Sequence, residues 1–504
     1  MEKTNLPSNP QKRIRMGPFF KSHNTTCFLV SLVLAGYLSG CKIVHNPAPI
    51  PHVAVPQVYS DRSSSTQVDS TNIGKRSPQE LFNDPNLVAL IDTALSRNLD
   101  LKIARQRIEA AQATYRISQG ALMPRVDAVA TASVDRYGRY TLNGVGNYDT
   151  NLSGNVSGSS LIPNPTPDYF VGLRSSWEVD LWGKLRNRRR AAFTRILASE
   201  EGRNLIVTSL IADVARLYYT LLALDAELEI IGDNVELQQK AVELVEVQKA
   251  AGRVTELAVQ QFKAQLLNTR ALEGRVLQDI VETENQLNRL LGRYPQPITR
   301  GASIEKQSVP TAISAGIPAQ LIRRRPDIRQ AERELEAANV DVAVAQAEFL
   351  PSLNLTPYLG FNAFRPGVLL NPQSLALGIF GGLAVPVLNR RQLQGNLALT
   401  TAQSREAYLA YQRTIINGVS EVVTGLKGLE NYRNVASLQR QEVAVLRQAT
   451  ATSNELFANG YATYLEVITA QRNVFEAQLA LVTTKRAQFL ALVDLYRALG
   501  GGTK

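Results

Sequence analysis

The chain has 504 residues, a formal net charge of +11, two cysteines and three histidines. Every cysteine and histidine lies before residue 53, which excludes His-dependent triads, cysteine nucleophiles and Cys/His metal sites from the rest of the chain. The basic residues are scattered among acidic ones along predicted helices, which argues against nucleic acid as a partner. Only carboxylate chemistry is left for an enzyme hypothesis. We expect neither an enzyme nor a cofactor.

Residues 1–40 predict a secretory signal peptide. Several basic residues precede an apolar run, Cys27 to Tyr37, that is too short to span a bilayer as a helix. The run ends in Leu-Ser-Gly followed by Cys41, which resembles a bacterial lipobox and implies lipidation of Cys41. The alternative is an ordinary signal peptide with a chance cysteine. Residues 41–80, rich in proline at first, predict an extended tether.

Residues 81–300 and 301–504 predict two copies of one structural unit. Arg97, Asp100 and Pro124 match Arg324, Asp327 and Pro351 at a constant spacing of 227 positions. Each copy begins with a helical apolar pattern, running from Asn86 to Leu122 in the first, that ends at the matching proline. Asp327 is expected to cap its helix, a simpler role than acid–base chemistry with a neighbouring carboxylate.

After each proline the apolar residues alternate, which predicts strand pairs within 125–181 and 352–387. The Gly-, Asn- and Ser-rich segment 141–168 predicts a long loop in the first pair. Four strands of about ten residues match the wall of a transmembrane barrel, but about eight are needed to close one. The strands must either form a soluble sheet or combine with other copies of the chain.

Each strand pair is followed by a predicted long helical hairpin, 184–292 in the first copy and 392–500 in the second. Heptad spacing is continuous through the first helix, which at residues 184–250 would be about 100 Å long. Gly252 and Gly460 break the pattern and begin shorter return helices. The helix that leads each copy would complete the shorter side by stacking end to end.

The motif RRPDIRQAE at residues 324–332, its duplicate, the strand pairs and the glycine tips resemble the TolC-like outer-membrane factor family, and with the lipobox its NodT-type lipoprotein branch. The resemblance implies a mixed α/β membrane protein: a trimeric 12-stranded outer-membrane β-barrel, four strands per chain, continued by a long periplasmic α-helical coiled-coil tunnel.

The function that this resemblance implies is the outer-membrane exit duct of a tripartite efflux pump for drugs or other small toxic compounds. The implied partners are two further copies in a homotrimer, a periplasmic adaptor (membrane fusion) protein, an inner-membrane RND-type transporter and outer-membrane lipid. A type I protein-secretion duct of the same fold and a periplasmic coiled-coil scaffold lipoprotein are the alternatives.

The resemblance also implies two sites. Adaptor contacts are expected at the helix reversals, although the glycines there could serve only the turn: Gly252, Arg253, Thr255, Gly460, Tyr461 and Thr463. A periplasmic gate is expected just beyond the second reversal, at Leu465, Glu466, Thr469 and Arg472. The alternative is that Glu466 and Arg472 form an ordinary surface pair. Thr469 stands where the family often has Asp, which leaves cation binding at the gate in doubt.

Two groups of residues near the strand ends have alternative interpretations. Basic residues open the first long helix, where they oppose the helix dipole, so we expect anionic headgroups or acidic neighbours beside them, or else a solvated helix face: Lys184, Arg186, Arg188, Arg189 and Arg190. Trp177 and Trp182 predict either an aromatic girdle at the membrane boundary or packing against the helix start.

Overall fold

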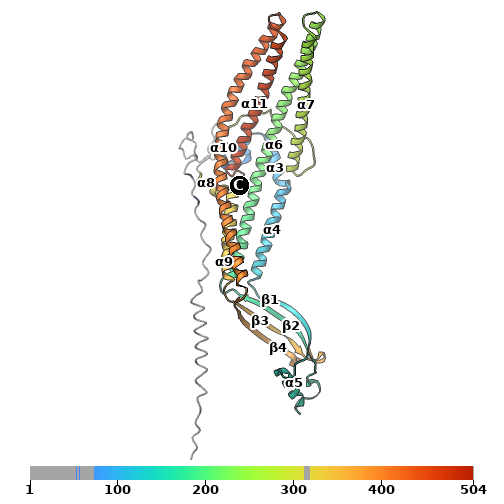
Figure 1. Cartoon of the computed structure of the whole chain (residues 1–504), viewed down its shortest axis with the longest axis vertical. Helices are drawn as coiled ribbons and strands as arrows, with labels where there is room; N and C mark the ends of the chain where they lie inside the picture. The colour runs from blue at the N-terminus through green and yellow to red at the C-terminus, as the bar shows by residue number, and fades with distance from the viewer. Residues whose placement is uncertain (1–52, 54–55, 57–72, 311–317, 503–504) are drawn as a thin grey trace, which may run out of the picture.

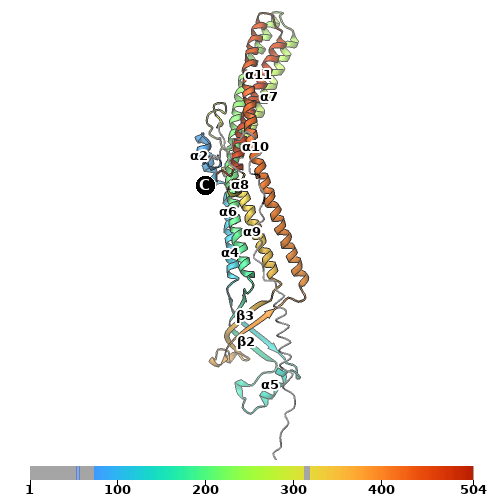
Figure 2. The same cartoon turned by 90° about the vertical axis from the view of Figure 1, so that its left-hand side faces the viewer.

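A computed structural model describes residues 53, 56, 73–310 and 318–502. The predicted signal peptide, Cys41 and the tether up to residue 72, apart from residues 53 and 56, lie outside the described residues. The chain is elongated, with two pairs of helices ending in tips at one end and a sheet of strands at the other (Figures 1 and 2).

Four antiparallel strands form one sheet in the order β1-β2-β3-β4. Their bounds are Arg125–Asp135 (β1), Thr166–Val179 (β2), Ser352–Ala363 (β3) and Leu375–Ala384 (β4). Asp127, Arg174, Tyr358 and Gly378 lie opposite one another across the four strands, so their side chains share one face. β1 and β4 are the edges, each with one side unpaired within the chain.

The long helices follow the strands. In the first repeat α3 (Pro85–Arg97) and α4 (Leu99–Gly120) precede the strands, and α6 (Lys184–Ala250) and α7 (Glu256–Leu290) follow them. The second repeat has α8 (Ala319–Arg324) and α9 (Pro326–Ala347) before its strands, then α10 (Arg390–Ala458) and α11 (Tyr464–Ala498). α4 and α9 each have 22 residues, and α7 and α11 each have 35, so the repeat is reproduced in element length.

The main core lies midway along the molecule, around α6. The helix buries Tyr218, Leu221 and Leu222 there, and it contacts α4, α7, α9 and α11. Helices of both repeats therefore pack around α6, which belongs to the first repeat (Figure 1). The chain just before α3 joins this core through Ile73 and Phe82, on either side of the short helix α2 (Pro78–Leu81).

Three local expectations were wrong. The segment 141–168 contains a helix, α5 (Leu142–Leu152), because Thr141 accepts a hydrogen bond from the Gly144 amide and caps it. The helical pattern from Asn86 to Leu122 is split at Asn98, whose side chain accepts from the Leu101 amide and starts a new helix. The second long helix begins at Arg390, two residues before the expected 392.

Candidate functional site

The first tip joins α6 to α7 through a glycine-centred turn. Gly252 has a φ of +69°, in the left-handed region that favours glycine, and nothing approaches the position that a Cβ would take. The Arg253 amide donates to the Gln248 carbonyl at 2.9 Å, which closes the end of α6. Thr255 then caps α7 by accepting from the Ala258 amide at 3.4 Å.

The second tip repeats this geometry between α10 and α11. Gly460 has a φ of +83°, and the Tyr461 amide donates to the Leu456 carbonyl at 2.8 Å. Glu466 closes a capping box, since its carboxylate accepts from the Thr463 amide at 2.5 Å and from the Thr463 hydroxyl at 3.1 Å. Glu466 is therefore held by the start of its own helix.

The expected gate residues divide into two groups. Leu465, Thr469 and Arg472 are spaced by four and three positions, so they lie along one stripe of α11. Leu465 is 56% exposed, and Arg472 pairs with Glu476, one turn further on, at 3.8 Å. Arg472 is thus paired with Glu476 and not with Glu466, and this stripe faces away from the packing within the chain.

The two tips are packed against each other. Val245, Val259 and Phe262 form a small apolar cluster between α6 and α7, and Tyr464 and Ile468 at the start of α11 pack against it. Figure 1 shows the two tips side by side at the same end of the molecule. A partner that binds at this end therefore meets both repeats together.

Midway along the molecule, equivalent residues tie each return helix to its leading helix. Asn98 donates from Nδ2 to the Leu290 carbonyl at the end of α7, at 2.9 Å. Arg325, 227 positions later, donates from Nη1 to the Ala498 carbonyl at the end of α11, at 3.0 Å. These bonds join the two pieces of the shorter side of each hairpin end to end.

Arg325 is the buried centre of an ionic cluster. It is 6% exposed, binds Asp327 through Nε and Nη2 at 3.0 and 2.7 Å, and binds Glu421 through Nη1 at 2.7 Å. Burial alone would lower the pKa of Arg325, but the hydrogen bonds and charges of Asp327 and Glu421 outweigh burial and raise it. Arg325 occupies the N-cap position of α9. The expectation that Asp327 caps this helix was therefore wrong.

Sequence reasoning gave Arg325 no role. The one available signal was its position, because it matches Asn98, a residue type that favours the N-cap.

The basic residues after β2 meet acidic neighbours. Lys184 pairs with Glu178, and Arg186 pairs with Asp180 at 3.0 Å. Arg188 and Arg190 reach across to α9 and its end, where they pair with Glu348 at 2.7 Å and Glu336 at 3.6 Å. The hypothesis of acidic neighbours is therefore confirmed for these four cations. Asp180 also accepts from the Leu185 and Arg186 amides, which satisfies the start of α6.

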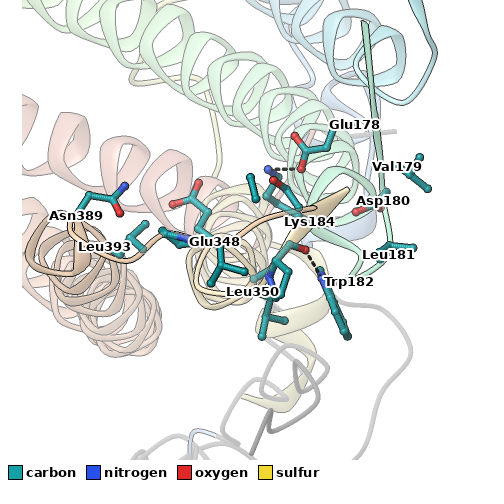
Figure 3. A pocket seen from close by; sticks show the side chains of 16 residues that line it. Glu178, Val179, Asp180, Leu181, Trp182, Lys184, Glu348, Leu350, Asn389 and Leu393 are labelled. Carbon is teal, nitrogen blue, oxygen red and sulfur yellow. Dashed lines mark hydrogen bonds and ion pairs between the residues drawn. The ribbon is translucent and has the colours of Figure 1, made fainter. Parts of the chain in front are cut away.

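A cavity of about 400 Å³ lies at this junction between the sheet and the helices (Figure 3). Trp182 lines it and donates from its indole to the Pro351 carbonyl at 2.7 Å, while Trp177 donates to the Leu122 carbonyl at 3.1 Å. Both indoles therefore fasten the chain at the C-terminal end of β2 to the links that precede β3 and β1. These hydrogen bonds reach the links and not the start of α6, where the packing alternative placed the two side chains. The aromatic girdle stays a prediction.

The two faces of the sheet differ in charge. All charged strand residues fall on one face, by strand alternation and register: Arg125, Asp127, Asp135, Asp168, Arg174 and Glu178. The opposite face is mainly aliphatic, with Leu173, Leu359 and Leu377 opposite one another. A cation on the lipid face of a barrel costs about 2–4 kcal/mol at mid-membrane, so the charged face is the lumen.

Within the described ranges, no group of three or more His, Cys, Asp or Glu side chains is arranged to hold a metal ion.

The sequence profile of a family described as outer membrane efflux protein matches residues 90–293 and 317–501. The chain is 30% identical over 468 residues to the solvent efflux pump outer membrane protein SrpC of Pseudomonas putida, covering 92% of the chain and 96% of SrpC. It is 27% identical over 477 residues to the cation efflux system protein CusC of Escherichia coli, covering 94% and 99%.

Among solved structures, the chain is similar to a membrane protein from Pseudomonas aeruginosa, with a TM-score of 0.80 and 27% identity. The similarity covers 91% of the chain and 100% of that protein.

Proposed function

This chain belongs to the outer membrane efflux protein family, and from that membership we propose that it is the last component of a tripartite pump, joined by a periplasmic adaptor to an inner-membrane RND-type transporter. The chain lies in the outer membrane and extends into the periplasm, and three chains form one channel with a twelve-stranded barrel. The predicted fold class, localisation and efflux function are confirmed.

The observation that best supports this role is the continuity of α6 and α10. Their 67 and 69 residues run from the barrel wall to the tips, about 100 Å at 1.5 Å per residue. A barrel alone would need only its strands. Helices of this length suit a protein that carries cargo through the periplasm to the outer membrane.

We propose small toxic compounds as the cargo class. Relatives are named for solvents, cations and antibiotics, and they match along more than nine-tenths of the chain. The family and its relatives are transport proteins and not enzymes. Neither the protein-secretion alternative nor the scaffold alternative has comparable support.

We propose the tips, at Gly252, Arg253, Thr255, Gly460, Tyr461 and Thr463, as the adaptor-binding site. They lie at the end of the molecule furthest from the sheet, and Tyr461 is 84% exposed. Just inside that end, we propose the stripe of Leu465, Thr469 and Arg472, with Glu466 beside it, as the gate. The support is that these side chains face away from the packing within the chain.

The proposed function is tested by deletion. A strain that lacks this gene should become more susceptible to at least one class of solvent, metal ion or antibiotic, and plasmid expression should restore resistance. Deleting the partner pump as well should add nothing, because both act in one path. Unchanged susceptibility together with loss of a secreted protein would contradict the efflux role and favour protein secretion.

A further inference from the structure

The luminal face of the barrel wall carries one cation that no carboxylate neutralises. Arg174 on β2 is exposed, and across the described residues no carboxylate lies in ion-pair contact with it. Asp127, directly opposite on β1, pairs with Arg125 at 3.0 Å, and Glu178 pairs with Lys184. The two nearest acidic residues on this face are therefore already engaged.

The other acidic residues of the luminal face lie near the outer end of the sheet. Asp168 accepts a hydrogen bond from Asn362 at 2.7 Å. Asp135 is eight positions from Asp127 along β1, about 26 Å away along the strand. Neither neutralises Arg174 at close range, because charges further apart than about 10 Å are largely screened in salt.

An aromatic ring, and not an ion pair, holds Arg174 in place. Its guanidinium carbon lies 4.6 Å from the centroid of the Phe170 ring, in a cation–π contact. Phe170 is only 3% exposed, because its ring covers two glycines of adjacent strands: a Cβ at Gly172 or Gly360 would lie 3.0 or 2.8 Å from its Cζ atom. The ring has no room to turn away, so it is a fixed support for the cation.

One further aromatic ring lies beside this cation on the same face. Tyr358 on β3 is directly opposite Arg174 and meets Phe170 edge to face, with centroids 6.1 Å apart. Its ring extends over Gly378 on β4, where a Cβ would come within 2.6 Å of it. Tyr358 is 40% exposed. Phe380, two residues further along β4, is more exposed, but its ring lies over Gly382, further from Arg174. The wall therefore presents a cation next to one accessible ring, Tyr358.

We propose that Arg174 and Tyr358 form a binding site in the barrel lumen for small aromatic anions, such as aromatic carboxylates or sulfonates. The guanidinium donates hydrogen bonds to the anionic group, and the Tyr358 ring packs against the aromatic body. The trimer carries three such sites around one lumen. Each lies on an open wall and encloses no cavity, so binding is weak and reversible, as a conduit requires.

The test uses the full-length trimer in planar bilayers, with 1-naphthalenesulfonate as the probe. The probe should reduce single-channel current in a concentration-dependent way. Arg174→Gln should raise the half-blocking concentration at least about fivefold, because a charge-assisted hydrogen bond is lost. Tyr358→Leu should raise it by about twofold to threefold, because the stacking partner is lost.

Arg125→Gln/Asp127→Asn is the matched control, since it removes a cation of the same luminal face together with its carboxylate partner and frees no carboxylate opposite Arg174. It should leave the block unchanged. The inference is overturned if this double variant weakens the block as much as Arg174→Gln does, if Arg174→Gln has no effect, or if methanesulfonate or 1-naphthylmethylammonium blocks equally well.

Arg174→Lys keeps the charge but loses the planar guanidinium. The probe should therefore block this variant with a strength between those for the wild type and Arg174→Gln. The unblocked conductance separates this inference from the proposed function. A normal open channel without block contradicts the site alone, whereas a failure to conduct in both the wild-type protein and the gate variant Arg472→Ala contradicts the channel itself.

Discussion

Asn98 and Arg325 hold the same position in the two repeats but stabilise it with different chemistry. Asn98 makes a neutral bridge between the start of α4 and the end of α7. Arg325 makes the same bridge to α11 and adds charged bonds to Asp327 and Glu421. A buried arginine with two carboxylate partners leaves uncompensated charge when it is removed, whereas a neutral amide does not.

Removing Arg325 should therefore destabilise the helical body more than removing Asn98. Arg325→Met should cost about 3 kcal/mol, because Asp327 and Glu421 lose their shared partner. Asn98→Ala should cost about 1 kcal/mol, the usual loss for an N-cap residue. The two variants are compared by the temperature at which the purified channel has lost half of its helical circular dichroism signal. Equal midpoints for the two variants would show that the ionic cluster adds nothing.

The gate residues are also tested one at a time. Arg472→Ala should raise single-channel conductance and let large antibiotics such as vancomycin enter cells, because it removes the longest side chain of the exposed stripe on α11. Glu466→Ala should do the same, but it also removes the capping box with Thr463, so a lower helix stability is expected with it.

Glu476→Ala is the control for Arg472, since it breaks the pair with Arg472 while leaving the arginine in place. If conductance and vancomycin entry match wild type in both Arg472→Ala and Glu466→Ala, these residues do not form the gate.

At the scale of whole elements, the two tips combine a required turn with an exposed surface. Both glycines have positive φ angles, and both turns are closed by the same backbone bonds. The side chains of Arg253, Thr255 and Thr463 lie around these turns.

Arg253→Glu, Thr255→Glu and Thr463→Glu should each weaken crosslinking to the adaptor and raise drug susceptibility, because each places a bulky acid on the tip. Lys240→Glu is the control: it reverses an exposed charge of the same helix twelve positions before Gly252, about 18 Å from the tip. Wild-type crosslinking in all the tip variants would leave the glycine turns with a structural role only.

At the scale of the whole molecule, the four strands of one chain cannot close a barrel, and three chains together supply twelve strands. Leu377 and Ala376 are neighbours on β4, next to the edge that pairs with another chain, and they face opposite sides of the wall. One side meets lipid and the other meets water.

Leu377→Arg should therefore strongly reduce the fraction of heat-modifiable trimer, since a cation facing lipid costs about 2–4 kcal/mol at mid-membrane. Ala376→Arg, the matched luminal variant, should leave the trimer largely intact. Purified trimer mass and gel migration with and without heating measure both. The reverse order would overturn the assignment of the two faces.

The sequence by itself determined the duplication, the helix and strand periods, the glycine turns and the fact that four strands cannot close a barrel alone. These features are local: a helix or strand shows its period in a few adjacent residues, and the repeat shows itself by constant spacing. That is why the tips at Gly252 and Gly460 and the strands after Pro124 and Pro351 were foreseen.

Only the tertiary structure decided which distant residues meet. Arg188 pairs with Glu348, 160 positions away, and Asn98 donates to the Leu290 carbonyl, 192 positions away. Phe170 lies over Gly360, a residue of the other repeat. Such contacts depend on strand register and on how helices stack end to end. Neither is recorded in the residues next to each partner, because many registers and stackings fit the same local periods.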